Sequence, residues 1–494
     1  MLPTVRENAG LHVYDGLVQD LSPSGVRAGM ARVGTGRPDG GPAGNDDAHL
    51  RAFEDLLRTS FLELEEHRAN PYAHIDNLDL SVYDREYAPA PERADARRRH
   101  LLAWPEAVDG AIASLDRVPA PTAACLVPAA RGLATGLDEA DAVEGPAQRA
   151  LERFVAHLRA AADQGDPDPA IGAQSLARLL SAGEAMDVDL AALAATADTE
   201  RDRLRAMLEQ ACGRIAPGRP LPDVIDDLTR DHPDADGVLE EARGQVEEAL
   251  AFTHGRDLVP GLDGECLVGV TPPARRWAFA MMTWAGPFEP DAPSWYHITP
   301  PEPDWPDEQQ QEWLEAFNRT TLPAITVHEV APGHFAHGRV LRRASSDVRK
   351  TLMSSAFVEG WAHYVEELCV EEGFRSDDPR FAAGVAIEAL VRVTRLAVSI
   401  GVHSGEMTLD EAARRFETDA YLRGPAARSE ANRATFDPTY GRYTWGKVEI
   451  LRVRERARRA WGAAYTLPRF HAELLALGAP PLGLMASGLG LPPS

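Results

Sequence analysis

Cysteine is scarce in this sequence of 494 residues. Its four cysteines, at positions 125, 212, 266 and 369, are scattered and form no C-x-x-C pair. A disulfide framework and a cysteine-ligated zinc site both depend on paired cysteines, so the sequence favours neither. Isolated cysteines suit a reducing compartment, and we therefore expect a cytoplasmic protein.

Long apolar runs are absent as well. Nowhere do 18 apolar residues follow one another, and residues 1–7 lack the basic and apolar stretches of a secretory signal. Positive charge is in deficit, because 51 Lys and Arg face 76 Asp and Glu and leave a net charge of −25. Such a surface disfavours nucleic acids and anionic membranes, so we expect neither as a partner.

Composition divides the chain into three predicted parts. Glycine and proline are dense in residues 23–47, which indicates a flexible leader over residues 1–47. Ala, Leu, Arg and Glu fill most of residues 95–255, which favours helices. We predict a helical region over residues 48–260 that forms one wall of a cleft, and a catalytic, metal-binding region over residues 261–494.

The predicted fold is mainly α, with a small β-sheet beside the active-site helices and a deep cleft. Helical patterns in the C-terminal half cover residues 306–317, 325–334, 352–372, 378–401 and 446–461. Strand-like runs are few, chiefly residues 266–270 and 294–299. An exposed edge at residues 294–299 could pair with an extended substrate backbone, and the alternative is a solvated hairpin edge.

One segment brings together the residue types of a catalytic zinc site. Residues 328–334 read H-E-V-A-P-G-H, and Glu359 follows 25 residues later in F-V-E-G-W-A-H-Y (357–364). Two imidazoles, a carboxylate beside the first and a second carboxylate downstream are the groups that hold a catalytic zinc ion and leave one position open for water.

The spacing of the two histidines requires a break in the helix. On a straight helix, His328 and His334 would lie about 120° and about 9 Å apart, too far for bonds of about 2.1 Å to one ion. Pro332 cannot donate a hydrogen bond to the carbonyl of His328, and Gly333 tolerates positive φ. If these two residues bulge out, the spacing falls to an effective four and the histidines meet. In the alternative, Pro-Gly ends the helix and they never meet.

Three ordered motifs resemble a known family. H-E-x-x-P-G-H is followed by E-G-W-A-x-Y and then by F-D-P-T-Y-G-R-Y-T-W-G-K-V-E-I (436–450), with R-F-H at 469–471. Over about residues 270–490, the chain is similar to the bacterial domain of unknown function 885 (DUF885) family. The resemblance implies a zincin-like, gluzincin-type metallopeptidase fold, in a family whose substrates are mostly unassigned.

The resemblance also implies roles for the matching residues. It makes His328, His334 and Glu359 the ligands of one Zn²⁺. Glu329 becomes the general base, which accepts a proton from metal-activated water. Elementary metal chemistry assigns the same roles, because a carboxylate beside a ligand histidine can accept that proton without binding the ion.

Neighbouring histidines leave alternatives open. His363 and Glu366 lie on the Glu359 face of a helix, so either could orient a ligand, although His363 is also explained as a packed polar residue. A rival site would pair His334 with His337, three residues on.

Hydrolysis also needs a donor for the developing oxyanion. A phenol, guanidinium or imidazolium can donate to that oxygen, which gives four candidates: Tyr443, Tyr440, Arg433 and His471. Tyr443 is the first choice because it matches the family's tyrosine three residues before a glycine, whereas either tyrosine is also explained as core packing. Lys447 and Arg433 are alternatively ligands of a substrate carboxylate or solvated charges that cap helices.

We therefore predict a zinc-dependent metallopeptidase that cleaves short peptides or small amides by metal-activated water. One alternative is a metal-dependent hydrolase of a non-peptide amide or ester. A second is an inactive helical binding protein, against which the presence of Glu329 speaks, because a binding scaffold needs no base.

Overall fold

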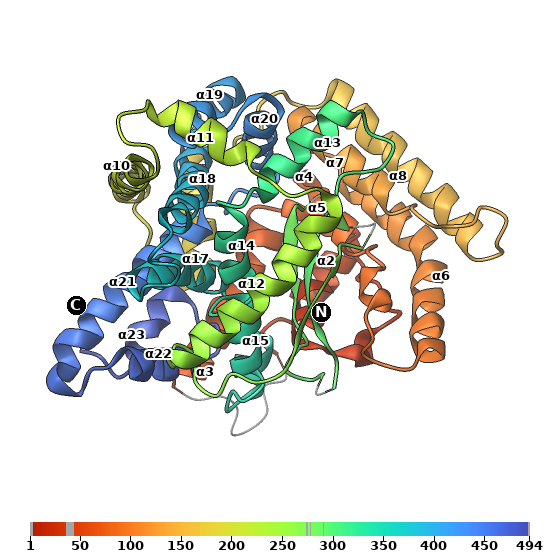
Figure 1. Cartoon of the computed structure of the whole chain (residues 1–494). Helices are drawn as coiled ribbons and strands as arrows, with labels where there is room; N and C mark the ends of the chain where they lie inside the picture. Colours follow the sequence, from red (N-terminus) through yellow and green to blue (C-terminus); the bar gives the residue numbers. More distant parts are fainter. Residues whose placement is uncertain (1–2, 36–43, 273–274, 277, 290, 493–494) are drawn as a thin grey trace.

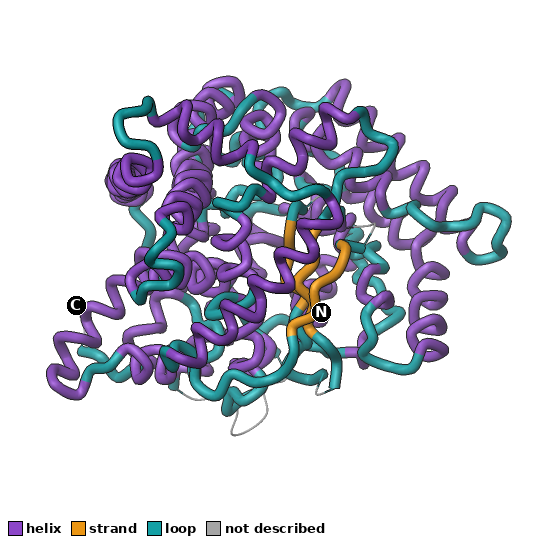
Figure 2. The backbone as a smooth tube through the Cα atoms, viewed as in Figure 1, coloured by secondary structure: helices purple, strands orange, loops and turns teal. Residues whose placement is uncertain are grey.

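Helices dominate the structure because good helix formers fill the chain between short turns. The computed structural model describes residues 3–35, 44–272, 275–276, 278–289 and 291–492. A small three-stranded sheet lies among the helices (Figures 1 and 2). The prediction of a mainly helical fold with a small sheet is confirmed. Among the described residues, no helix combines the length and the apolar character needed to cross a membrane.

Along the chain, the three strands stand between two groups of helices. The helices before the sheet are α1 (Pro3–Ala9), α2 (Pro23–Met30), α3 (Asn45–Arg58), α4 (Glu66–Ala69), α5 (Tyr72–Asp76), α6 (Ala90–Ser114), α7 (Ala120–Gly132), α8 (Glu144–Gln164), α9 (Ala173–Glu184), α10 (Leu190–Ile215), α11 (Leu221–Arg230) and α12 (Ala235–Gly255). The strands are β1 (Cys266–Val270), β2 (Ala280–Thr283) and β3 (Ser294–Ile298). The helices after the sheet are α13 (Asp307–Leu314), α14 (Leu322–Glu329), α15 (His334–Leu341), α16 (Asp347–Thr351), α17 (Ser355–Glu371), α18 (Pro379–His403), α19 (Leu409–Asp419), α20 (Gly424–Arg433), α21 (Arg442–Trp461), α22 (Leu467–Leu475) and α23 (Met485–Gly488).

The N-terminal segment is helical, in contrast to the predicted flexible leader. In α1, Glu7 accepts two hydrogen bonds from Arg275, far along the chain. In α2, Val26 is buried against Phe61. The leader prediction is therefore wrong for α1 and α2, because ion pairs and apolar contacts with distant residues hold these helices. Residues 36–43, which belong to the same glycine- and proline-rich stretch, lie outside the described residues.

One hydrophobic cluster connects both halves of the chain. It extends from Leu176 in α9 to Leu491 near the C-terminus and includes side chains of the sheet and of α10, α12, α17, α18 and α21. A second cluster joins α6, α7 and α8. The main core therefore crosses the predicted boundary between residues 260 and 261.

The sheet has the order β1-β3-β2, so the strand that contains Tyr296 is the central one. Val268 of the parallel strand β1 and Met282 of the antiparallel strand β2 both lie opposite Tyr296. The expectation of an exposed edge at residues 294–299 is therefore wrong, because β2 covers that side. β2 is an edge strand and leads to Trp284, whose ring centroid lies 6.1 Å from that of His334.

Helices α17 and α21 cross with their backbones in contact. A Cβ atom on Gly446 would lie 1.8 Å from the carbonyl oxygen of Ala356, and one on Gly360 would lie 2.5 Å from Cα of Gly446. Only glycine leaves room for this approach. The crossing brings Glu359, which precedes Gly360, to the same region as Tyr443, one turn before Gly446.

Gly446→Ala should force the two helices apart. Because the obstacle is backbone, we expect a loss of about 2 kcal/mol of stability, typical of overpacking, measured as a lower thermal unfolding midpoint. Gly244→Ala in α12 is the control, since a Cβ atom there meets nothing within 4 Å. An unchanged midpoint in Gly446→Ala would show that the crossing does not constrain the helices.

Candidate metal centre

The chain between α14 and α15 loops out two residues. Gly333 N donates to the carbonyl of Val327 at 3.1 Å, and Ala336 N donates to that of Val330 at 3.0 Å. Both bonds span six residues instead of the four of an α-helix. The helix predicted over residues 325–334 is therefore split into α14 and α15, and the predicted bulge is confirmed.

The looped segment needs Gly333 for space. Gly333 has a φ of −75°, so its tolerance of positive φ is not used and that part of the prediction is wrong. A Cβ atom there would lie only 1.8 Å from the carbonyl oxygen of His328. Trp361 of α17 holds the same loop, because its Nε1 donates to the carbonyl of Pro332 at 2.9 Å.

The loop brings the three predicted metal ligands together. Candidate ligand atoms of His328, His334 and Glu359 all lie within 4.8 Å of one another. Glu359 Oε2 is 3.6 Å from His328 Nε2 and 3.3 Å from His334 Nε2. This oxygen is buried and makes no hydrogen bond within the described residues. Donor atoms around a tetrahedral zinc ion with bonds of about 2.1 Å lie about 3.4 Å apart, so the three residues fit one such ion.

Carboxylates hold His328 from two sides. Its Nδ1 donates to Glu366 Oε1 at 2.5 Å, which leaves Nε2 for the cluster. Burial and Arg392 oppose a charge on the ring, but Glu359 and Glu366 outweigh them and raise the pKa of His328 to about 9. Burial alone would raise the pKa of Glu359, but the two imidazoles lower it well below its usual range. Glu366 thus occupies the orienting position predicted for it.

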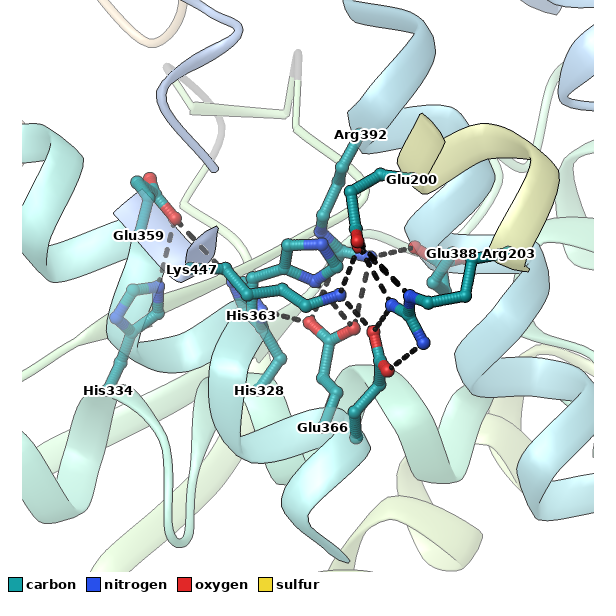
Figure 3. A network of polar contacts seen from close by, with 11 residues as sticks. Glu200, Arg203, His328, His334, Glu359, His363, Glu366, Glu388, Arg392 and Lys447 are labelled. Atoms are coloured by element: carbon teal, nitrogen blue, oxygen red, sulfur yellow. Dashed lines mark hydrogen bonds and ion pairs between the residues drawn. The ribbon is translucent and has the colours of Figure 1, made fainter. Parts of the chain in front are cut away.

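Arg392 of α18 balances the charge of Glu366 (Figure 3). Its guanidinium lies 3.4 Å from Glu366 Oε1 and 3.1 Å from Glu388 Oε2. Burial opposes ionisation of Glu366, but Arg392 and two histidines hold its pKa far below the usual range. The sequence analysis missed Arg392. The available signal was an arginine within the apolar stretch A-L-V-R-V (389–393), where an unpaired charge would be costly.

Lys447 is buried in a second ion cluster beside the first (Figure 3). It forms an ion pair with Glu367 and lies 3.6 Å from Glu200 of α10. Arg203, also in α10, donates to Glu367 at 2.9 Å. The side chain of Lys447 is only 1% exposed, so it is not a solvated charge and is not free for a substrate carboxylate. Helix α10 thus contacts α17 and α21 next to the candidate centre.

Glu329, the last residue of α14, lies next to His328 and near the sheet. Its carboxylate has no hydrogen-bond or ion-pair partner within the described part of the chain. Burial raises the pKa of the Cys266 thiol to about 12, and the negative charge of Glu329 adds to this rise, which places the carboxylate near β1. A carboxylate without a partner beside a ligand histidine is available to accept a proton.

Tyr443 also lies beside His328. The two ring centroids are 6.3 Å apart with an angle of 26° between the planes. Arg392 and Arg395 lie 5.9 and 5.2 Å from the centroid of the tyrosine ring, and Arg433 interacts with this tyrosine as well. The guanidinium charges favour negative charge nearby, and the phenol can donate to an oxygen at the cluster.

Two predicted oxyanion donors are engaged elsewhere. Tyr440 is fully buried, and its hydroxyl donates to the carbonyl of Glu430 at 3.3 Å. His471 Nδ1 donates to the carbonyl of Leu258 at 2.8 Å, and its Nε2 accepts from the hydroxyl of Tyr364 at 3.0 Å. Burial lowers the pKa of His471 to about 3, so the ring is neutral. These contacts contradict the prediction that Tyr440 and His471 donate to the oxyanion.

Two further histidines near the cluster contact other groups. His337 Nε2 donates to the carbonyl of Gly478 at 3.1 Å, and burial lowers the pKa of His337 to about 4. His363 Nδ1 lies 3.2 Å from Glu366 Oε2. Within the described residues, the rival pair of His334 and His337 does not form a metal cluster.

The fold and the site define a mainly helical protein with a candidate centre of two histidines and one glutamate. The family described as bacterial protein of unknown function (DUF885) matches residues 3–489, so the chain belongs to this family. No curated protein matches its sequence.

Two solved structures are similar along almost their whole length. One, described as a "putative lipoprotein of unknown function" from Shewanella oneidensis, has a TM-score of 0.76 at 20% identity and covers 98% of this chain and 96% of its own. The other, described as a "putative lipoprotein" from Colwellia psychrerythraea, has a TM-score of 0.74 at 15% identity and covers 99% and 96%. At this identity the likeness shows a shared fold.

Gly333→Ala should disrupt the loop, because the added methyl group would collide with the carbonyl of His328. We expect a lower thermal unfolding midpoint, a loss of about 2 kcal/mol or more, and failure to retain zinc. Calorimetry and elemental mass spectrometry measure these effects, with Gly244→Ala as the control. Wild-type zinc retention in Gly333→Ala would contradict the role of this glycine.

Proposed function

We propose that the protein is a zinc-dependent hydrolase with a zincin-like centre, most simply a metallopeptidase that cleaves short peptides. The observation that carries the proposal is the convergence of His328 and His334 on Oε2 of Glu359, a buried oxygen that makes no hydrogen bond within the described residues. Glu329, whose carboxylate has no partner within the described residues, follows His328 in the chain, and the ring of Tyr443 lies 6.3 Å from that of His328. The cytoplasmic location and the cleft that would admit short peptides remain predictions.

Each residue of the centre has a separate task in this proposal. His328, His334 and Glu359 would hold the ion. Zinc, when bound, supplies Lewis acidity, which polarises a carbonyl group and makes water more acidic. Glu329 accepts the proton of the attacking water and passes it to the leaving amine.

The surrounding side chains support these tasks. Tyr443 donates to the carbonyl oxygen as negative charge develops on it, and the nearby guanidinium groups stabilise that charge. Glu366 fixes the ring of His328 through Nδ1, and Arg392 keeps Glu366 ionised. β2 is an edge strand that leads to Trp284, whose ring lies 6.1 Å from that of His334, so an extended substrate backbone would pair along β2.

Metal content tests the centre directly. Protein purified without chelators or a histidine tag should contain about one zinc ion per chain by elemental mass spectrometry. His334→Gln should lose the ion because it removes one of three ligands. His337→Gln, three residues on and engaged with a carbonyl, should keep it. Wild-type protein that binds no stoichiometric metal even when zinc is supplied would refute the proposal.

Glu329→Gln tests the general base. The variant keeps the three ligands, so we expect unchanged zinc content but a kcat for short peptides that is lower by about 10²- to 10⁴-fold. Glu312→Gln, an exposed carboxylate of α13, should behave like wild type. Normal turnover in Glu329→Gln would exclude this residue as the base.

A further inference from the structure

A cavity of about 290 Å³ begins about one helical turn from Glu359, at the first residues of α17. It lies between the N-terminal helices α3, α4, α5 and α9 and the first turns of α17 and α21. Ser355 lines the cavity and precedes Glu359 by four residues, so both lie on one face of α17, about 6 Å apart along the helix axis. Arg442, another lining residue, directly precedes Tyr443. The spacing therefore places the cavity within reach of a long side chain next to a bond held at the candidate centre.

Much of the cavity wall is apolar. Its aromatic lining comes from both sides of the cavity and consists of Phe53, Phe61, Tyr72, Phe436 and Trp445. Leu179, Leu180 and Met353 add aliphatic surface. Such a wall suits a long side chain whose stem consists of methylene groups.

Two carboxyl groups of the cavity lack a positive partner within the described residues. Glu184 and Glu66 both line it, and neither forms an ion pair within the described residues. Glu184 accepts hydrogen bonds only from neutral donors, Ser354 Oγ at 2.7 Å and Leu482 N at 2.8 Å. Asp437 is different, because two arginines, Arg433 and Arg442, already neutralise it.

A buried imidazole adds an independent acceptor to the same cavity. His67 also lines the cavity, and its residue is only 4% exposed. Its Nδ1 atom is buried and has no hydrogen-bond partner within the described residues. Burial lowers the pKa of His67, so the ring is neutral and has a nitrogen that can accept a hydrogen bond.

The pKa values of Glu184 and Glu66 are raised, as expected for buried carboxyl groups without a counter-ion. Burial raises the pKa of Glu184 to about 7 and also raises that of Glu66. A positive group in the cavity would favour their ionised forms and would pair with them. An anionic group would instead meet two carboxylates.

We propose that this cavity receives a substrate side chain with a long apolar stem and a cationic end, that is, lysine or arginine next to the bond that is cleaved. The stem lies against the aromatic wall, and the cation is held by Glu184, Glu66 and His67 Nδ1. That the bound molecule is a substrate rests on the proposed hydrolase function. The preference of the cavity for a cation can be measured without turnover.

Binding to the full-length protein tests the cavity by itself. Isothermal titration calorimetry should show at least about tenfold tighter binding of N-acetyl-lysinamide than of N-acetyl-norleucinamide, which lacks only the terminal ammonium group. Glu184→Gln and Glu66→Gln should each reduce this preference, whereas Glu106→Gln, an exposed carboxylate of α6, should leave it unchanged. Because Glu184 also accepts a hydrogen bond from Ser354, Glu184→Gln can lower the thermal unfolding midpoint. In that case the binding preference of Glu66→Gln tests the proposal.

Equal affinity of wild type for the two amides, or tighter binding of N-acetyl-glutamate amide, would overturn the proposal. Peptide cleavage then separates the two inferences. A lysine preference in binding without cleavage of any peptide would refute the hydrolase and leave the cation site. Cleavage with the same kcat/KM for lysine and norleucine peptides would support the hydrolase and refute the cation site.

Discussion

The candidate centre depends on the two hydrogen bonds that span six residues between α14 and α15. They replace the regular helical pattern and thereby place two histidines, six apart in sequence, around one carboxylate oxygen. The other features of the motif support this loop. Gly333 leaves room for the carbonyl of His328, and Trp361 binds the carbonyl of Pro332. Glu359, two positions before this tryptophan, is the third residue of the cluster, so one turn of α17 both completes the candidate centre and holds its loop in place.

Buried charge imposes a second constraint. Glu359 and Glu366 both contact His328, and two carboxylates in a dry interior need compensation. Arg392 provides it next to Glu366, and a zinc ion would provide it next to Glu359. Glu366 is thus balanced by a permanent charge of the chain, whereas the groups beside Glu359 are two imidazoles, whose charge depends on their protonation.

Local chemistry explains which parts of the site could be predicted from the sequence. The bulge that brings His328 and His334 together follows from their spacing and from the properties of proline and glycine in between. The sequence motifs also identified His471 as notable, but its actual contacts, with Tyr364 and Leu258, depend on segments far away in the chain. A sequence motif can mark a residue such as His471. Its role depends on contacts with residues that are distant in the sequence.

Long-range contacts explain the remaining errors. The ion pair of Glu7 with Arg275 joins residues 268 positions apart, and no local composition reveals it. The central position of β3 likewise depends on β2, a short strand whose four residues, A-M-M-T, carry little strand signal. The mainly helical fold was predictable because the helix propensities of many residues add up along the chain. It does not depend on any single long-range contact.

The ion cluster around Lys447 also limits how the molecule can move. Glu200 and Arg203 of α10 are locked to Lys447 and Glu367 of the two crossing helices behind the centre. A hinge motion that swung α10 away would leave a buried ammonium group with fewer counter-charges, at a cost of several kcal/mol. The ion pairs therefore disfavour separation of α10 from α17 and α21 at this point. We therefore expect ligands to reach the candidate centre without separation of these three helices.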